Sequence, residues 1–240
     1  MTDAARDTVR ASRGRPKFYL VMSLVLAAIV TFGFSHTVPH DFVAPGLPVL
    51  LQLHAAIFVA WVLLFVAQPA LVVSGSPALH RKLGWFGAGL AAAMVAMGGA
   101  AILFALRADT LPFFYPPGLF LVRGTLGLAV FAGLIIAAIA RRRQAEWHRR
   151  LMLCASIVVI VPGLERALPV PVMGPSWPFI VDGVVDLLAL VGPIRDLIER
   201  RRIHHAYYWG IGAIVVGQMT TDLLSPSTLA AIMVHALGAS

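Results

Sequence analysis

The sequence RRRQAEWHRR, residues 141–150, separates two long apolar runs at 119–140 and 151–164. It holds five arginines and one histidine, more charge than hydrocarbon tolerates. The segment therefore predicts a loop at a membrane surface, where the chain turns back. The same chemistry returns at two other apolar boundaries, 80–82 (HRK) and 200–205 (RRRIHH). We expect all three loops to bring histidine and positive charge to one face of the membrane.

The composition indicates that the bilayer is the solvent of this chain. Of the 240 residues, 59% are hydrophobic and 12% are charged, against roughly 45–50% and about 25% in soluble domains. The net charge of +8 flanks apolar runs instead of lining one soluble face. This excludes a nucleic-acid partner and predicts anionic lipids at the cytoplasmic face as the partner. Cys154 is the single cysteine, which excludes an intrachain disulfide.

Seven apolar runs have about the 20 residues that a helix needs to cross a bilayer. They lie at 18–34, 47–73, 83–106, 119–140, 151–168, 179–198 and 207–224. The runs are continuous and lack the alternation of barrel strands, so they predict an all-α, polytopic bundle of seven transmembrane helices. Residues 1–17 form a mobile basic tail in this prediction and 18–224 the membrane domain. In the tail at 225–240, the short apolar piece at 228–237 is expected to be an interfacial helix.

The distribution of lysine and arginine predicts the orientation. With the amino terminus in the cytoplasm, sixteen of the nineteen cations fall on the inner side. The remaining three, Arg107, Arg123 and Arg166, fall on the outer half. The positive-inside rule then predicts a cytoplasmic amino terminus and an external carboxyl terminus. We expect the protein in the inner (cytoplasmic) membrane of a bacterium.

Polar residues near the inner ends of the helices form a first candidate site. His80, His148 and His204 each open a predicted helix, and Gln68 lies one to two turns above the inner end of the second helix. Converging imidazoles could ligate a metal or a haem iron, and the adjacent Arg81 and Arg150 could pair with haem propionates. The alternative is that these side chains are ordinary loop residues that extend to lipid headgroups.

A second candidate site lies at depth in the outer half. His54, Trp61 and Gln68 are spaced by seven and share one stripe of their helix. The remaining members are the polar residues of the later helices: Arg123, Glu165, Arg166, Asp182, Asp186, Gln218 and Asp222. Unpaired charges cost several kcal/mol at this depth, so we expect Arg123 or Arg166 to pair with Asp186 or Glu165. The functional interpretation is an outward-facing polar pocket with His54 as proton carrier or axial ligand, and the alternative is a structural ion-pair network.

The polar residues follow an order along the chain: His54, Gln68, His80-Arg81, Gly84, Glu146-x-His148-x-Arg150-Leu151-Met152 and Arg166. From the second to the seventh helix, this pattern resembles uncharacterised families of multi-pass bacterial membrane proteins. It is also distantly similar to the ascorbate-linked b-type cytochromes, which hold haems between transmembrane histidines, and to membrane factors for oxidase assembly. The fourth apolar run carries Arg123 and no histidine. The resemblance therefore implies at most one bis-histidine site, His80 with His148, for haem b or a transition metal.

Three functions remain open from the sequence. The first is a redox-linked protein that binds haem or metal through His80 and His148, with His204 as a further ligand. The second is a non-enzymatic carrier that uses the outer pocket for a small molecule. The third is a structural subunit or assembly factor of a membrane complex, as a homo-oligomer or with another protein. No His-x-x-x-His pair near the carboxyl end supports a metal-dependent hydrolase.

Overall fold

The computed structural model describes residues 3–35 and 48–238, with side chains from residue 17 onward. Every regular element in these ranges is helical. The helices are α1 (Asp3–Ser35), α3 (Val49–Val73), α4 (Pro77–Arg107), α5 (Pro117–Ala140), α6 (Ala145–Val158), α7 (Val161–Ala167), α8 (Trp177–Arg200), α9 (His205–Leu224) and α10 (Thr228–Ala236). Two short 3₁₀ turns, Val170–Val172 and Gly174–Ser176, lead into α8. The prediction of a helical membrane bundle is confirmed.

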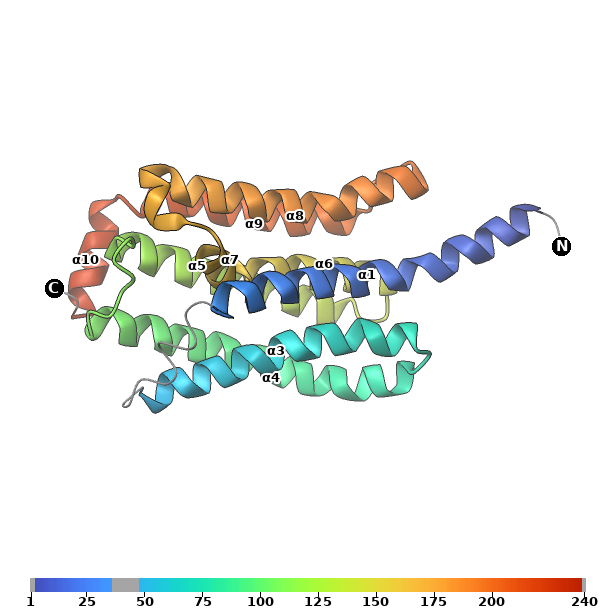
Figure 1. Ribbon diagram of the computed structural model, residues 1–240, viewed down its shortest axis with the longest axis horizontal. Coiled ribbons are helices and arrows are strands. Elements are labelled where there is room, and N and C mark those ends of the chain that lie inside the picture. Colours follow the sequence, from blue (N-terminus) through green and yellow to red (C-terminus); the bar gives the residue numbers. More distant parts are fainter. Residues whose placement is uncertain (1–2, 36–47, 239–240) are drawn as a thin grey trace.

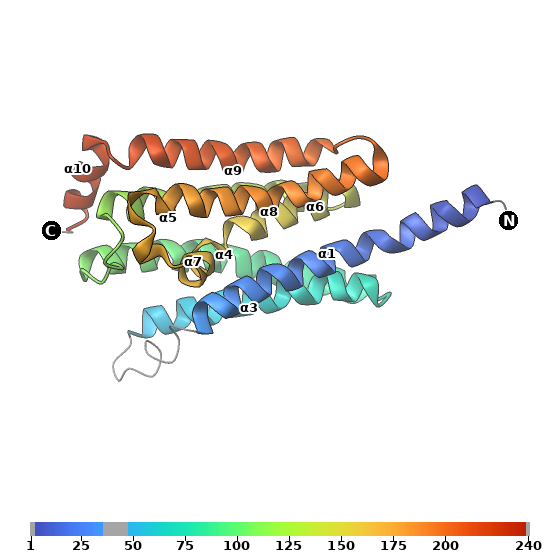
Figure 2. The same ribbon diagram turned by 45° about the horizontal axis from the view of Figure 1, so that its top comes forward.

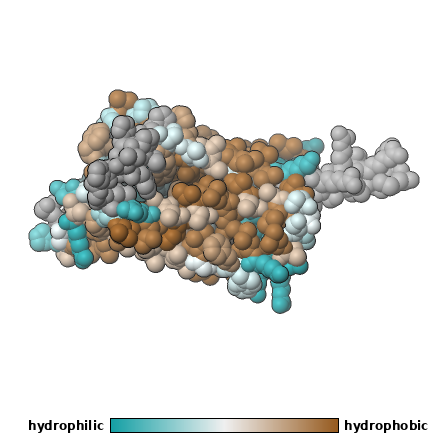
Figure 3. Space-filling model, turned by 60° about the horizontal axis from the view of Figure 1, so that its bottom comes forward, coloured by the Kyte–Doolittle hydropathy of each residue, from teal (hydrophilic) through white to brown (hydrophobic). Residues whose placement is uncertain are grey.

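The long helices lie roughly parallel to one axis, and the loops gather at two ends (Figures 1 and 2). The turns between α3 and α4, α5 and α6, and α8 and α9 share one end, which we call the basic end. The turn between α4 and α5, and α10, lie at the opposite end. A broad apolar surface covers the middle of the bundle in Figure 3, and hydrophilic side chains gather at its two ends. This distribution is typical of a protein whose sides face lipid.

In the part of the chain that the structure describes, five helices are long and apolar enough to cross a membrane. They are Lys17–Ser35, Val49–Val73, Pro77–Arg107, Pro117–Ala140 and Gly174–Arg200. The predicted fifth crossing, 151–168, differs most from expectation, because it is two helices, α6 and α7, separated at Val159 and Ile160. Pro162 has no N–H to donate to the carbonyl of Val158, so a continuous helix loses a hydrogen bond here.

The amino-terminal end of the chain is more helical than the sequence suggested, and the carboxyl-terminal end has the expected short helix. The predicted basic tail at 1–17 is helical from Asp3, as the first part of α1. This part of α1 projects beyond the rest of the bundle at the basic end (Figure 2). The predicted interfacial piece at 228–237 forms α10, whose Ala230 and Val234 are buried. Arg107 at the end of α4 donates to the carbonyl of Leu237, 3.0 Å away, and holds this tail against the bundle.

Glycines allow the helices to approach closely. A side chain at Gly33 of α1 would collide with the backbone carbonyl of Gly163 in α7, so these two helices touch backbone to backbone. Between α4 and α5, the side chain of Leu128 fits over Gly98, and that of Ile102 fits over Gly124. Trp61 of α3 packs edge-on against the fully buried Phe131 of α5, with 5.2 Å between ring centroids. Such packing of small against large residues is how helices associate in lipid.

Candidate functional site

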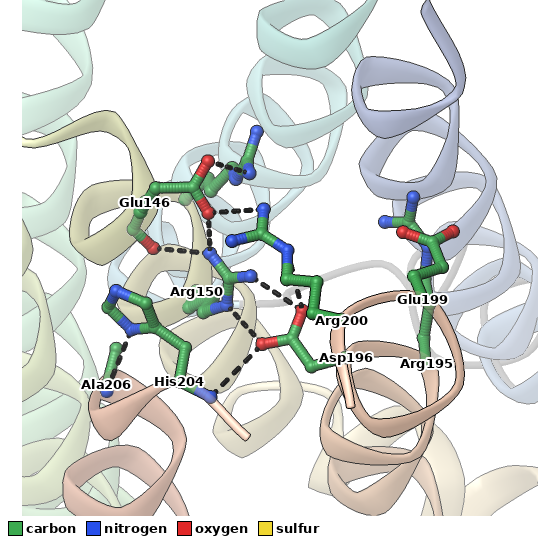
Figure 4. Close-up of polar contacts among 9 residues, drawn as sticks. Glu146, Arg150, Arg195, Asp196, Glu199, Arg200, His204 and Ala206 are labelled. Atoms are coloured by element: carbon green, nitrogen blue, oxygen red, sulfur yellow. Dashed lines mark hydrogen bonds and ion pairs between the residues drawn. The ribbon is translucent and has the colours of Figure 1, made fainter. Parts of the chain in front are cut away.

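A buried arginine organises the basic end. Arg150, in the second turn of α6, is 1% exposed. It donates from Nε and Nη2 to the two carboxylate oxygens of Asp196 on α8, at 2.9 and 2.6 Å (Figure 4). Its Nη1 donates to the carboxylate of Glu146, at 2.6 Å, and to that residue's backbone carbonyl, at 2.9 Å. The guanidinium is therefore neutralised inside the protein by two carboxylates in a fork geometry.

Two further arginines tie this cluster together. Arg200 at the end of α8 donates to Glu146 over 2.6 Å, and Arg149 pairs with the other oxygen of the same carboxylate. Glu146 thus connects the start of α6 with the end of α8 (Figure 4). The i, i+3 and i, i+4 spacings of a helix put Arg149 and Arg150 within reach of Glu146. In the same way, Arg200 lies one turn after Asp196.

Aromatic residues close the other side of Arg150. Its guanidinium lies 5.4 Å from the ring centroid of Tyr207 on α9, and the hydroxyl groups of Tyr207 and of Tyr19 on α1 lie close together. Any side chain larger than glycine at position 192 would collide with Tyr207, which explains how α9 approaches α8 so closely. Four helices, α1, α6, α8 and α9, therefore meet at this arginine.

The arginines change the acidity of their neighbours. Burial raises the pKa of Glu146, but the hydrogen bond from Arg150 and the charge of Arg149 outweigh it and bring the value to about 2. Burial lowers the pKa of His204, and the charge of Arg150 lowers it further. Glu146 is therefore a carboxylate and His204 a neutral imidazole near pH 7.

His80 and His148 lie side by side at the basic end. Their ring centroids are 6.4 Å apart and the rings are nearly perpendicular, at 83°. His148 donates from Nδ1 to the carbonyl of Ala138, 2.9 Å away, which leaves its Nε2 unprotonated when the ring is neutral. With its amide nitrogen turned toward His80, Gln68 donates to the ring Nδ1 and to the carbonyl of His80, the latter at 3.2 Å. His148 is thus held as metal-ligating histidines usually are, because it donates from one ring nitrogen to a carbonyl. The Nδ1 of His80 accepts instead, which puts the proton of the neutral ring on Nε2.

The third predicted ligand lies elsewhere. His204 caps the start of α9, where its Nδ1 accepts from the backbone N–H of Ala206 at 3.1 Å, and its ring packs against Trp147. Within 3–35 and 48–238, no three His, Cys, Asp or Glu side chains come together as a metal site. Among the described residues, the structure therefore does not bring His204 together with His80 and His148 as one group of ligands. Arg81 is exposed and lies close enough to His80 for its charge to act on that ring.

The outer candidate residues include a second ion cluster. Arg123 of α5 donates to both carboxylate oxygens of Asp182 on α8, at 2.7 and 3.2 Å. Its Nε lies 3.4 Å from Glu165 of α7, which also accepts a hydrogen bond of 2.7 Å from the hydroxyl of Tyr115. The ring of Trp177 lies 5.7 Å from the guanidinium. The charges contact one another directly, in the manner of a structural network.

The other members of the predicted outer pocket are dispersed. Arg166 donates to the carbonyl of Pro162 and lies over the ring of Phe34, 4.6 Å away, so it is not the arginine that pairs with Asp182. His54 contacts the backbone carbonyl of Met97. Asp186, one turn after Asp182, has a buried Oδ1 without a hydrogen-bond partner, and the expected pairing of Asp186 with arginine does not occur. Asp222 of α9 lies close enough for its charge to act on the carboxylate of Asp182. Gln218 lies one turn before Asp222 on α9 and is half-buried.

The cavity that is best defined among the described residues lies away from both clusters. Residues of α1, α3 and the break between α6 and α7 line it, and its volume is about 10 Å³. Trp61, which was predicted to face an outer pocket, lies in this cavity's wall. A space of this size holds about one water molecule. It does not accommodate a substrate or a porphyrin.

Sequence reasoning missed Tyr19, Tyr115, Asp196 and Tyr207. For Asp196 a signal existed, since an acidic residue four positions before Arg200 interrupts an apolar helix. The tyrosines gave none, because tyrosine is ordinary near a membrane surface. Comparison of the chain with family models, with curated protein sequences and with solved structures finds no match.

Proposed function

We propose that His80 and His148 bind a transition-metal ion and that the protein is a metal-binding, redox-linked membrane protein. The observation that carries this proposal is the 6.4 Å between the two ring centroids, together with the unprotonated Nε2 of His148. Ligation by the Nε2 of His80 requires the other tautomer of that ring, with its proton on Nδ1. A metal–nitrogen bond of ~2.0–2.1 Å puts the metal about 3.2 Å from a ring centroid, so two rings on opposite sides of one ion lie about 6.4 Å apart. Imidazole pairs suit copper, zinc and nickel.

An ion fits this site better than haem. A porphyrin also takes two opposed imidazoles, but it needs a flat slot beside them. Among the described residues, the best-defined cavity has only about 10 Å³ and lies near Trp61 and Ser156. The arginine expected to pair with propionates, Arg150, already pairs with Asp196 and Glu146. We therefore favour the metal ion over the haem b that the resemblance implied.

Our proposal includes a topology of seven crossings, with the basic end in the cytoplasm of a bacterial inner membrane. In it, α6 and α7 together make the fifth crossing and α9 the seventh. The shared end of the three basic turns supports this orientation (Figure 1), because the positive-inside rule favours one cytoplasmic face for them. A reporter fused after residue 143 tests the topology, and a periplasmic signal there would refute it.

Metal titration of the purified protein tests the binding site. After treatment with a chelator, the protein is titrated with Cu²⁺ and Zn²⁺ in separate samples, and bound metal is measured by elemental analysis after desalting. We expect about one ion per chain, and its loss in His80→Ala and in His148→Ala. His205→Ala is the matched control, because His205 is an exposed histidine at the same end. Equal binding in all variants would refute the proposal, and a Soret band in the protein as isolated would favour haem.

A structural or assembly subunit is the second candidate. It is favoured by the two ion clusters, whose charges are satisfied within the bundle and join helices distant in sequence. The carrier hypothesis has less support, because Arg123, Asp182 and Glu165 contact one another. If metal binding fails while His80→Ala and His148→Ala fold normally, the structural candidate becomes the better one.

A further inference from the structure

From residue 17 onward, each carboxylate of the basic end is paired with an arginine. Glu146 pairs with Arg149, Arg150 and Arg200, and Asp196 pairs with Arg150. Glu199 pairs with Arg195 over 2.8 Å. From residue 17 onward, the three basic turns and the helix ends beside them contain no other acidic residue. Within the side chains that the structure describes, no carboxylate at this end is left for the cations at the surface.

A second set of cations at the same end lies exposed. Its members are Arg81, Lys82, Arg141, Arg142, Arg143, Arg201 and Arg202. None of them forms an ion pair with a carboxylate of the described chain. The basic end therefore has two sets of cations. Carboxylates of the protein neutralise the first set, and the exposed set needs anions from outside the protein.

Lys82, Trp85 and Arg142 form one corner of the basic end. Lys82 and Trp85 are three residues apart on α4, so they share a face of that helix. Arg142, from the turn between α5 and α6, places its guanidinium 5.4 Å from the centroid of the Trp85 ring. The ring supports one face of the guanidinium, and Nη1 donates to the carbonyl of Ile139 at 3.2 Å. The other N–H groups of Arg142 remain available to an anion.

This corner borders the surface that faces lipid. Trp85 is 63% exposed, and the neighbouring apolar residues Leu79 and Phe86 are 50% and 60% exposed. A soluble anion gains nothing from apolar side chains. A phospholipid, in contrast, places a phosphate at the level of Lys, Arg and Trp while its acyl chains cover the apolar residues below. The combination of unneutralised charge, a stacked arginine and exposed apolar surface therefore favours a lipid.

We propose that Lys82, Trp85 and Arg142 form a binding site for the headgroup phosphate of an anionic phospholipid. Lys82 and Arg142 pair with the phosphate, and Trp85 holds Arg142 in place. The acyl chains lie along the exposed apolar face of α4. The site is separate from the metal pair, since neither His80 nor His148 contributes to it, so one proposal can fail without the other.

Lipid binding by the whole protein in neutral detergent tests this site. Native mass spectrometry with added phosphatidylglycerol or phosphatidylcholine gives the affinity for each lipid, and inorganic phosphate tests for a free anion. We expect preference for phosphatidylglycerol, and a roughly 10- to 30-fold loss of its affinity in Lys82→Gln/Arg142→Gln. The matched control, Arg201→Gln/Arg202→Gln, removes the same charge at the same end and should lose much less.

Three results would overturn the proposal. Equal losses in the two double variants would show diffuse attraction by the whole surface. Equal affinity for the two lipids would show that the anionic charge is not recognised, and competition by millimolar phosphate would show a site for soluble anions. If Lys82→Gln/Arg142→Gln does not fold, Trp85→Ala decides, because it removes the stacking surface without changing charge. Unchanged phosphatidylglycerol binding in Trp85→Ala would overturn the proposal as well.

Discussion

Replacing Asp196 with asparagine would keep the size of the side chain and remove one of the two negative charges that neutralise Arg150. Asp196 accepts two hydrogen bonds from this arginine, at 2.6 and 2.9 Å, and Arg150 is 1% exposed. In the variant, an amide NH₂ group faces an arginine N–H. Removing one partner of a buried pair costs about 3–5 kcal/mol, because the other charge stays buried. The folded-to-unfolded ratio should therefore fall by roughly two to three and a half orders of magnitude.

Equilibrium unfolding of the purified protein, in mixed micelles with increasing dodecyl sulfate, measures this loss. The matched control is Glu199→Gln, which breaks the more exposed pair with Arg195 and should cost about 0.2–1 kcal/mol. The double variant Arg150→Met/Asp196→Leu removes both charges and should recover most of the stability lost in Asp196→Asn. If Asp196→Asn costs no more than Glu199→Gln, the reasoning about a buried, mutually dependent pair is refuted.

Three other predictions concern packing, the outer cluster and pH. Gly192→Ala should lower the free energy of unfolding by about 1–3 kcal/mol, because the new methyl group collides with Tyr207; Gly212→Ala, where the added group meets open space, is the control in the same unfolding assay. Tyr115→Phe removes a 2.7 Å hydrogen bond to Glu165 and should cost about 1.5–3 kcal/mol, and a loss below 0.5 kcal/mol would contradict the buried geometry. His204 has a lowered pKa in the folded protein. Its contribution to the free energy of unfolding is therefore complete above the ordinary pKa of 6.5 and is lost as the pH falls below 6.5. The lowered pKa of Glu146 adds a second loss of stability, between the ordinary pKa of 4.5 and about 2. The free energy of unfolding, measured from pH 8 to pH 3, should show both losses, and Glu146→Gln should lack the one at acid pH.

The sequence predicted the helical segments and their ends well, because charge and apolar residues cannot exchange places in a bilayer. The neighbouring positions of His80 and His148 followed from the same pattern, since both residues begin helices at one end. The break before Pro162 was visible as a proline, but whether a proline kinks or divides a helix depends on the helices around it. The seven-crossing count therefore rested on a run that the structure divides.

Pairing between distant helices was the part that sequence could not predict. Arg150 and Asp196 are 46 residues apart, and only the placement of α6 beside α8 brings them together. In the outer cluster, the expected pairing of Arg123 with Glu165 is confirmed, whereas its shorter pairing with Asp182 was not predicted. The placement of His204 has a local reason. Its ring turns back to cap α9, a role that spacing alone does not distinguish from ligation.

Both ion clusters are anchored on α8, and this arrangement leads to a last prediction. Asp182 and Asp196 are fourteen residues apart, about 21 Å along a helix, and on nearly the same face. If α8 only joins the two ends, the costs of Asp182→Asn and Asp196→Asn should add to within about 0.3–0.5 kcal/mol in the double variant. A larger deviation would mean that one cluster senses the other through movement of α8. If the protein is only a structural subunit, the two free-energy costs should add. Costs that do not add would favour a protein in which a change at one end of the bundle alters the other end.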